Sequence, residues 1–401
     1  MTPTNRADTQ ATDTQAADTQ ATDTQAADIQ GTETRTADPQ AADTQVTGPQ
    51  PAGARPVTGR VVRAGGLSLR IAPRTLVVGT VVAALLAAVM VVTLTAGGYS
   101  LTLGQLLASL AGRGDETGDF VVYTLMLPRL LVAVLVGAML AVSGAILQTV
   151  TRNALGSPDV IGFTSAAATG ALVVITVLGG TMLQVSFGAL IGGLVAALLI
   201  YVLAYHRGVS GLRFVLMGIG INALAVAANS FLITRASLHD ALTAQAWLVG
   251  SVNSRGWEHV VAAAASLAAL LPVALSRTRS LSMMELGDDT ARALGARAGR
   301  DRSLLIGVSV LLAALAVAAA GPITFVALAA PQLTRRLTRS SAPGLVTTAL
   351  VGALLLATGD LLVQQLFPAA QLPVGTATGC VGGLYLIWLL ASEWRGKGRY
   401  A

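Results

Sequence analysis

The sequence contains few of the residues that build catalytic and metal-binding sites. Its 401 residues include one cysteine, Cys380, and three histidines, His206, His239 and His259. A single cysteine excludes an internal disulfide framework and a cysteine metal site. The histidines are scattered at the edges of apolar segments, which favours solvated or interfacial side chains. No cluster of His, Asp, Glu or Cys is visible at one depth, so we expect neither a catalytic residue nor a metal site.

Charge is equally scarce. Charged residues make up 11% of the chain and hydrophobic residues 53%, with a mean hydropathy of +0.68, which excludes an ordinary soluble domain. A helix of about 20 apolar residues crosses a bilayer. Charged side chains are absent from residues 75–98, 130–151, 160–205, 214–234, 260–276, 303–334, 340–359 and 361–392.

Three of these segments are too long for one crossing and must fold back. Glycine and proline pairs supply natural breaks at residues 179–180, 321–322 and 368–373. Division at these points predicts an all-α membrane protein with ten transmembrane helices. The eighth helix, about 323–335, is short and contains Pro331. Irregular backbone at that depth requires cover from protein or a water-filled cavity.

The basic residues are unevenly distributed between the two sides of the membrane. If the N-terminus is cytoplasmic, 20 of the 24 lysines and arginines beyond residue 50 fall in cytoplasmic segments. The other four are Arg113, Arg129, Arg235 and Arg255. This bias predicts that both termini are cytoplasmic. It also accounts for the net charge of +6, so nucleic acid is not an expected partner.

The region before the first apolar segment divides into two parts. Residues 1–50 repeat a degenerate pentad of the type ATDTQ and have almost no large apolar side chains. Such a segment cannot bury enough surface to fold, which predicts a disordered cytoplasmic tail. Residues 51–74 form a basic juxtamembrane segment, expected to contact lipid headgroups. Residues 75–396 are expected to form the single membrane domain.

One compact charged segment, residues 281–302, lies between two uncharged ones; we call it the charged loop. The arginine distribution places it in the cytoplasm after the sixth span. Ser282 followed by Glu285 fits a capping box that opens a short helix. An inert connecting loop is one interpretation. Docking of a soluble partner is the interpretation we favour, because inert loops of this length are seldom so fully capped.

The charged loop also contains a second predicted helix. Gly287 interrupts the first one, and Asp288 can cap the next. Ala291 and Leu294 lie on one face of it, and Gly295 is a suitable stop. The pattern therefore predicts two short helices that meet at a glycine elbow.

Several polar residues lie in or beside the apolar segments. Gln148, Asn222 and Asn229 predict either hydrogen bonds between helices or a polar lining of a pathway. Asn153 and Pro158 are typical of a cap and turn that lead into the third span. Arg129 and Asp360 lie at outer edges, where snorkelling and ion pairing compete with a functional role.

Five ordered blocks of the sequence closely resemble the permeases that import iron siderophores and vitamin B12, the membrane subunits of type II ABC importers. The blocks are residues 127–162 (LPR, GAMLAVSGAILQ, RNAL, PDVIG), 247–257 (WLVGS and Trp257), 285–295 (ELG, Ala291, LG), 321–335 (GPITF, Pro331, Arg335) and 360–375 (Asp360, LPVG). The resemblance extends over about residues 75–394.

The resemblance implies ten helices per subunit, two permease subunits as a heterodimer or homodimer, two ABC ATPase subunits and an extracytoplasmic substrate-binding lipoprotein, in the plasma membrane of a bacterium. ATP and Mg²⁺ would be bound by the ATPase, because this chain has no phosphate-binding loop motif; no cofactor of its own is expected. The implied coupling residues are Glu285, Leu286, Gly287, Asp288, Ala291, Leu294 and Gly295. Arg129 would dock the binding protein. Gln148, Asn153, Pro158, Pro331, Gln332, Arg335 and Asp360 are expected to have pathway or structural roles.

The sequence departs from the family pattern at several positions. Met126 and Gln364 stand where outward arginines are usual, which leaves Arg129 as the remaining one. Gln332 replaces a usual histidine, and residues 382–384 lack the usual proline. These changes indicate weakened docking by charge, or a subunit specialised for a heterodimer.

The expected cargo is a ferric siderophore, with cobalamin or haem as the alternative within the same family. An ion-coupled secondary transporter is the alternative of another class. That class would place ionisable residues within the spans, and none occurs in the uncharged segments.

Overall fold

The computed structural model describes residues 60–64, 67–71, 73–96, 102–205, 211–294, 298–340, 344–367 and 372–397, all within the compact unit Thr58–Ala401. The predicted tail of residues 1–50 lies outside the described residues. Side chains in residues 60–71 and in parts of the charged loop and the last helix are also outside what is described.

The described chain is helical apart from one short hairpin. The elements are β1 (Arg60–Ala64), β2 (Leu67–Ile71), α1 (Pro73–Ala96), α2 (Leu103–Leu110), α3 (Glu116–Phe120), η1 (Val121–Met126), α4 (Leu127–Thr151), α5 (Pro158–Ile161), α6 (Phe163–Val173), η2 (Val174–Leu178), α7 (Met182–Ala204), α8 (Gly211–Arg235), α9 (Leu238–Leu248), α10 (Trp257–Ser276), α11 (Thr278–Glu285), α12 (Asp288–Ala293), α13 (Ala298–Ala320), α14 (Val326–Thr338), α15 (Leu345–Leu366) and α16 (Val374–Lys397). β1 and β2 pair antiparallel.

Seven helices of the described residues are long and apolar enough to cross a membrane: α1, the continuous helix from α3 to α4, α7, α8, α10, α13 and α15. The helix formed by α6 and η2 is apolar but shorter. The predicted breaks are confirmed, since η2 ends at Leu178, α13 at Ala320 and α15 at Leu366. The expected total of ten spans stays a prediction, because α14 has only 13 residues and α16 is described only in part.

The core is built around α4. Nearly all of its side chains from Pro128 to Val150 are buried, and α13, α14 and α15 pack around it. Outer helices do the reverse: Leu76, Leu198 and Leu224 are more than half exposed. Large apolar side chains that point away from the core suit a protein whose surroundings are lipid rather than water.

Small residues let the helices around α4 approach closely. A Cβ at Gly137 would overlap the backbone of Gly352 on α15, and one at Gly144 would overlap that of Ala327 on α14. Without a hydrophobic drive between helices in lipid, such backbone contact is a main source of association. Gly137 and Gly144 of α4 therefore lie at helix crossings.

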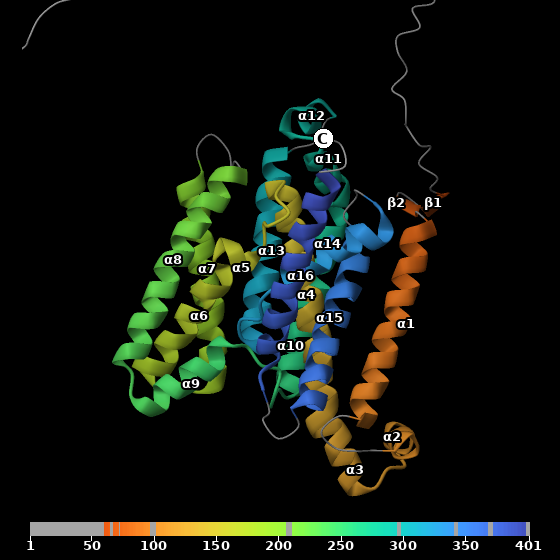
Figure 1. Cartoon of the computed structure of the whole chain (residues 1–401), viewed down its shortest axis with the longest axis vertical. Helices are drawn as coiled ribbons and strands as arrows, with labels where there is room; N and C mark the ends of the chain where they lie inside the picture. The colour runs from red at the N-terminus through yellow and green to blue at the C-terminus, as the bar shows by residue number, and fades with distance from the viewer. Residues whose placement is uncertain are drawn as a thin grey trace, which may run out of the picture. The chain divides into compact units, whose positions relative to one another are not determined.

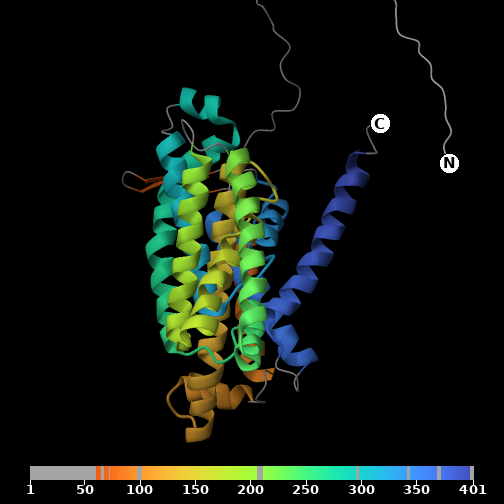
Figure 2. The same ribbon diagram turned by 90° about the vertical axis from the view of Figure 1, so that its left-hand side faces the viewer.

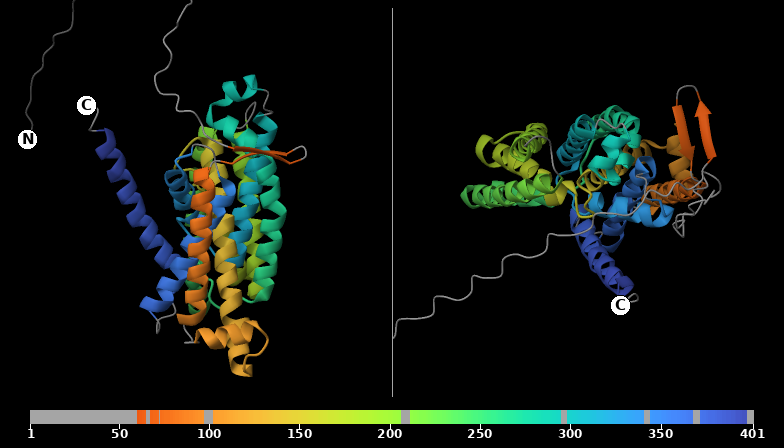
Figure 3. Two further views of the ribbon diagram at one scale, coloured as in Figure 1. Left: turned by 90° about the vertical axis from the view of Figure 1, so that its right-hand side faces the viewer. Right: turned by 90° about the horizontal axis from the view of Figure 1, so that it is seen from above.

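The charged loop lies at one end of the bundle, and several short helices lie at the other. Figure 1 shows α11 and α12 at one end and α2, α3 and α9 at the other. The C-terminal helix α16 leans away from the remaining helices, as the side views show (Figures 2 and 3). Among the basic residues of the described segments, Arg277 directly precedes α11 and Arg335 contacts it, whereas Arg113 follows α2 and Arg235 ends α8, before α9.

Candidate functional site

The first helix of the charged loop begins earlier than the sequence suggested. The helix α11 runs from Thr278 to Glu285, with Arg277 preceding it. Ser282 is therefore inside the helix, where its hydroxyl donates to the carbonyl of Thr278. The predicted capping box of Ser282 and Glu285 is wrong, because the Glu285 carboxylate is bound to a distant helix instead.

Gly287 forms the elbow between α11 and α12, as predicted. Its φ of +105° lies in a region that L side chains rarely adopt. Its amide donates to the carbonyl of Met284, which closes the end of α11, and its carbonyl accepts from the amide of Ala291 in α12. α12 begins at Asp288, so the second predicted helix is present. The side chain of Asp288 and the predicted stop at Gly295 are outside the described residues.

Each helix of the charged loop is followed by a leucine whose side chain is exposed. Ala291 is fully buried, whereas Leu286 is 64% and Leu294 55% exposed. These two leucines are candidates for contact with a partner, because their side chains are accessible beside the buried Ala291.

Glu285 connects the end of α11 to α14 and, through Arg335, to α4. Its Oε1 accepts from Nη2 of Arg335 on α14 at 2.8 Å, and the same nitrogen donates to Oγ1 of Thr149 on α4 at 2.9 Å. The Glu285 side chain is 19% exposed and that of Arg335 36%. Burial raises the pKa of Glu285, and the nearby Arg335 lowers it by a smaller amount.

Asp301 holds the beginning of α11. Its carboxylate accepts from Nη1 of Arg277 at 2.9 Å and from Oγ of Ser280 at 2.6 Å. Asp301 lies in the first turn of α13 and is 5% exposed. Sequence reasoning missed this cluster, although an acidic residue between the two arginines Arg300 and Arg302 was a visible signal.

The short helix α14 is held by polar contacts along its length. Gln148 on α4 donates to the carbonyl of Leu328 at 3.0 Å, and Gln332 donates to the carbonyl of Ala154 at 2.7 Å. Pro331 is buried inside the helix. These contacts favour the interpretation of Gln148 as a link between helices.

A similar backbone contact organises the turn before α14. Phe325 has a φ of +69°, unusual for a residue with a side chain, and its amide donates to Oδ2 of Asp159 at 3.1 Å. In the turn that leads to α5, the side chain of Asn153 accepts from the amide of Leu155. Ser157 is the N-cap of α5, and Pro158 occupies its first turn. The turn at Asn153 and the position of Pro158 are as predicted, but the cap of α5 is Ser157, which was not predicted.

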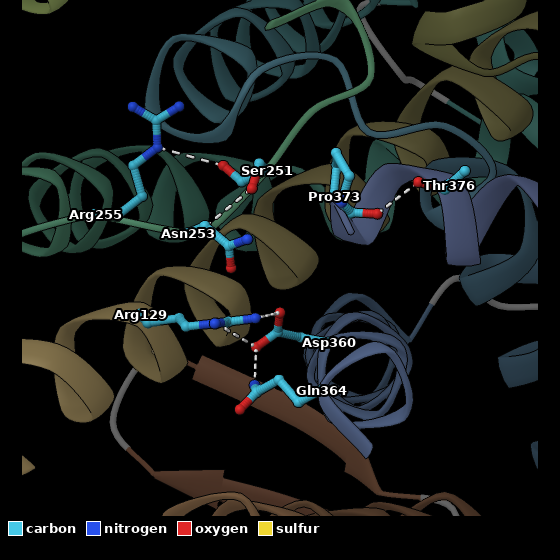
Figure 4. Close-up of polar contacts among 8 residues, drawn as sticks. All are labelled: Arg129, Ser251, Asn253, Arg255, Asp360, Gln364, Pro373 and Thr376. Atoms are coloured by element: carbon cyan, nitrogen blue, oxygen red, sulfur yellow. Dashed lines mark hydrogen bonds and ion pairs between the residues drawn. The ribbon is translucent and has the colours of Figure 1, made fainter. Parts of the chain in front are cut away.

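At the opposite end, Arg129 and Asp360 form a bidentate ion pair between α4 and α15 (Figure 4). The distances are 3.0 Å from Nε and 2.7 Å from Nη2. Gln364 donates to the same carboxylate at 2.8 Å. The side chain of Asp360 is 1% exposed and that of Arg129 23%, so most of the arginine side chain is buried beside Asp360. A docking role for Arg129 stays a prediction.

Three backbone breaks meet close to this ion pair. The amide of Ser251 donates to the carbonyl of Ala320 at 2.7 Å, and that of Gly375 donates to the carbonyl of Gly250 at 3.1 Å. A Cβ at Gly375 would overlap the carbonyl oxygen of Val249. We call residues 249–251, 320–322 and 373–375 the outer junction; Figure 4 includes Ser251, Pro373 and the neighbouring Arg255, whose Nε donates to the Ser251 carbonyl.

Comparison with known proteins gives consistent matches. Residues 85–392 match the model of the FecCD transport family. The chain is 44% identical over 304 residues to the ferric enterobactin transport system permease protein FepG of Escherichia coli (strain K12), covering 76% of this chain and 92% of that protein. It is 33% identical to the iron(3+)-hydroxamate import system permease protein FhuG of Bacillus subtilis (strain 168), covering 79% and 96%.

A solved structure gives the same result. An ABC transporter assigned to the metal-chelate type, in an inward-facing conformation, superposes with a TM-score of 0.72 at 28% identity. The match covers 79% of this chain and 99% of that one.

Proposed function

The chain belongs to the FecCD transport family, and we propose that, as the permease subunit of a type II ABC importer, it carries ferric siderophores across the membrane. It is a transport permease and not an enzyme. The observation that carries the cargo assignment is the 44% identity to a permease named for ferric enterobactin. Cobalamin and haem are the alternative cargoes.

We propose that partner subunits supply the energy for transport. We place ATP and Mg²⁺ on ABC ATPase subunits that dock against the charged loop. The exposed Leu286 and Leu294 supply the apolar part of that contact, and a surface of this kind gains stability when it is covered.

The remaining partners follow the family architecture. We propose ten spans with both termini in the cytoplasm, on the side of the charged loop, and a second permease subunit beside this one. A substrate-binding lipoprotein would meet the opposite end, where Arg129 keeps 23% of its side chain exposed.

Uptake of radiolabelled iron chelates tests the cargo. In a strain that lacks this chain, uptake of at least one ferric siderophore is expected to fall to the background level and to return when the chain is supplied. Labelled cobalamin and haem serve as parallel measurements. If every ferric chelate enters normally without the chain, the iron assignment is wrong, and loss of cobalamin or haem uptake would identify the alternative.

The docking surface is tested by Leu286→Asp and Leu294→Asp. A charge on a covered apolar surface costs at least the lost burial of a leucine, roughly 2 kcal/mol, so we expect ATPase association to weaken by about tenfold or more for each variant. Co-purification of the partner ATPase at several concentrations measures the change. Leu103→Asp is the matched control, because Leu103 is 55% exposed on α2 at the opposite end and should leave association intact.

A further inference from the structure

Each end of α11 is connected to another helix through a carboxylate, one on α13 and one on α11 itself. At its beginning, Arg277 and Ser280 bind Asp301 of α13. At its end, Glu285 binds Arg335 of α14. These contacts attach both ends of α11 to the membrane helices, and α12 follows α11 after the elbow at Gly287.

The contacts at the end of α11 also join the membrane helices to each other. One guanidinium nitrogen of Arg335 donates both to Glu285 and to Thr149 of α4, at 2.8 and 2.9 Å. Thr149 is 1% exposed, so this contact reaches the buried face of the central helix. The side chains of Leu281 and Met284, on the inner face of α11, are fully buried as well.

Hydrogen bonds to charged partners are shorter and stronger than those between neutral groups. The two carboxylates are 19% and 8% exposed as side chains, which reduces screening by water and salt. A helix held in this way at both ends, with a buried apolar face between them, has little freedom to tilt independently of α4, α13 and α14.

We propose that Glu285 and Asp301 form a two-ended clamp that makes α11 one rigid body with the membrane helices. Arg335 is the positioning residue: from α14 it contacts both Glu285 of α11 and Thr149 of α4. The clamp deepens the proposed function: an ATPase that pushes the charged loop then moves three membrane helices together, and bending is confined to the elbow at Gly287. Without the clamp, α11 would absorb the motion, and ATP would be hydrolysed without transport.

The test uses the complete complex in proteoliposomes, with ATPase association, ATP hydrolysis and uptake measured on the same preparation. For Glu285→Gln and for Arg335→Gln we expect the ATPase to remain bound, hydrolysis to stay within about twofold of the unaltered complex, and uptake per ATP to fall by about tenfold, the effect of a lost hydrogen bond to a charged group. Arg339→Gln is the matched control, since Arg339 is an exposed arginine at the end of the same helix, and it should not change uptake per ATP.

The charge-exchanged variant, Glu285→Arg with Arg335→Glu, separates the ion pair from either residue alone. Recovery of at least part of the uptake per ATP supports the clamp. An exchanged variant no better than the single ones, single variants with unaltered uptake per ATP, or loss of the ATPase from the complex would each overturn it.

A distance measurement examines the clamp without reference to cargo. Replacement of Cys380, the single cysteine, by serine allows spin labels at Ser282→Cys on α11 and Leu337→Cys on α14. The separation of the labels is expected to be the same with and without ATP, and to broaden in Glu285→Gln. A separation that changes with ATP in the otherwise unaltered complex contradicts the clamp. Because this readout needs no transported ligand, a wrong cargo assignment would leave its result unchanged.

Discussion

Arg129→Met is expected to destabilise the folded chain by about 3–5 kcal/mol, because it leaves the buried carboxylate of Asp360 without its charged partner. Asp360 is 1% exposed and cannot turn to water. Gln364 still donates to it, but a neutral amide does not offset a buried charge. The free energy of unfolding in mixed micelles measures the loss.

The partner substitution should cost less. Asp360→Leu leaves Arg129, whose long side chain is already 23% exposed and can extend its charged end to the interface. The double variant, Arg129→Met with Asp360→Leu, replaces both charges by apolar groups and should recover most of the stability. Arg113→Met is the control, an exposed arginine at the same end. Equal losses for the two single variants would contradict this account of the ion pair.

Gly287→Pro is expected to reduce transport by about a hundredfold or more while the chain still inserts into the membrane. Proline holds φ near −65° and has no amide hydrogen, whereas Gly287 has a φ of +105° and donates to Met284. An energy cost of about 3 kcal/mol at this position corresponds to roughly two orders of magnitude in the population of the docking-competent loop. Uptake assays and the amount of chain in isolated membranes measure the two effects.

Two further variants show whether the backbone conformation is responsible. Gly287→Ala keeps the amide donor but is strained at positive φ, so an intermediate loss is expected. Gly299→Pro places the same residue in the first turn of α13, where proline is tolerated and no neighbour lies within 4 Å of an added Cβ. It should transport normally. Full uptake by Gly287→Pro would remove the elbow from the coupling path.

Much of the helix arrangement was predictable because it depends on local patterns. The lengths of the uncharged segments predicted the apolar helices, and the glycines and prolines within them predicted where these helices end. Gly287 predicted the elbow between α11 and α12. The start of α11 was predicted five residues too late, with Ser282 as the N-cap where the structure has Arg277. Ser282 and Glu285 have the spacing of a capping box, but Glu285 is bound to Arg335, which is 50 residues away. Sequence spacing cannot weigh a local cap against a distant ion pair.

Other parts were missed for different reasons. The pair of Arg129 and Asp360 spans 231 residues, so each residue was identified as interfacial without its partner. The outer helix α2 was not predicted, although Thr102 and Gln105 form a capping box that opens it; this signal was available in the sequence. The hairpin of β1 and β2 falls in a segment whose basic composition indicated only lipid contact.

The outer junction restricts how the helices that meet at it can move relative to one another. Backbone hydrogen bonds join the segment before α10 to the end of α13 and to the start of α16, and at Gly375 any side chain would overlap the carbonyl of Val249. We therefore expect the three segments to move as one unit. In mechanical terms, we expect a pivot, about which the attached helices rotate without separating from one another.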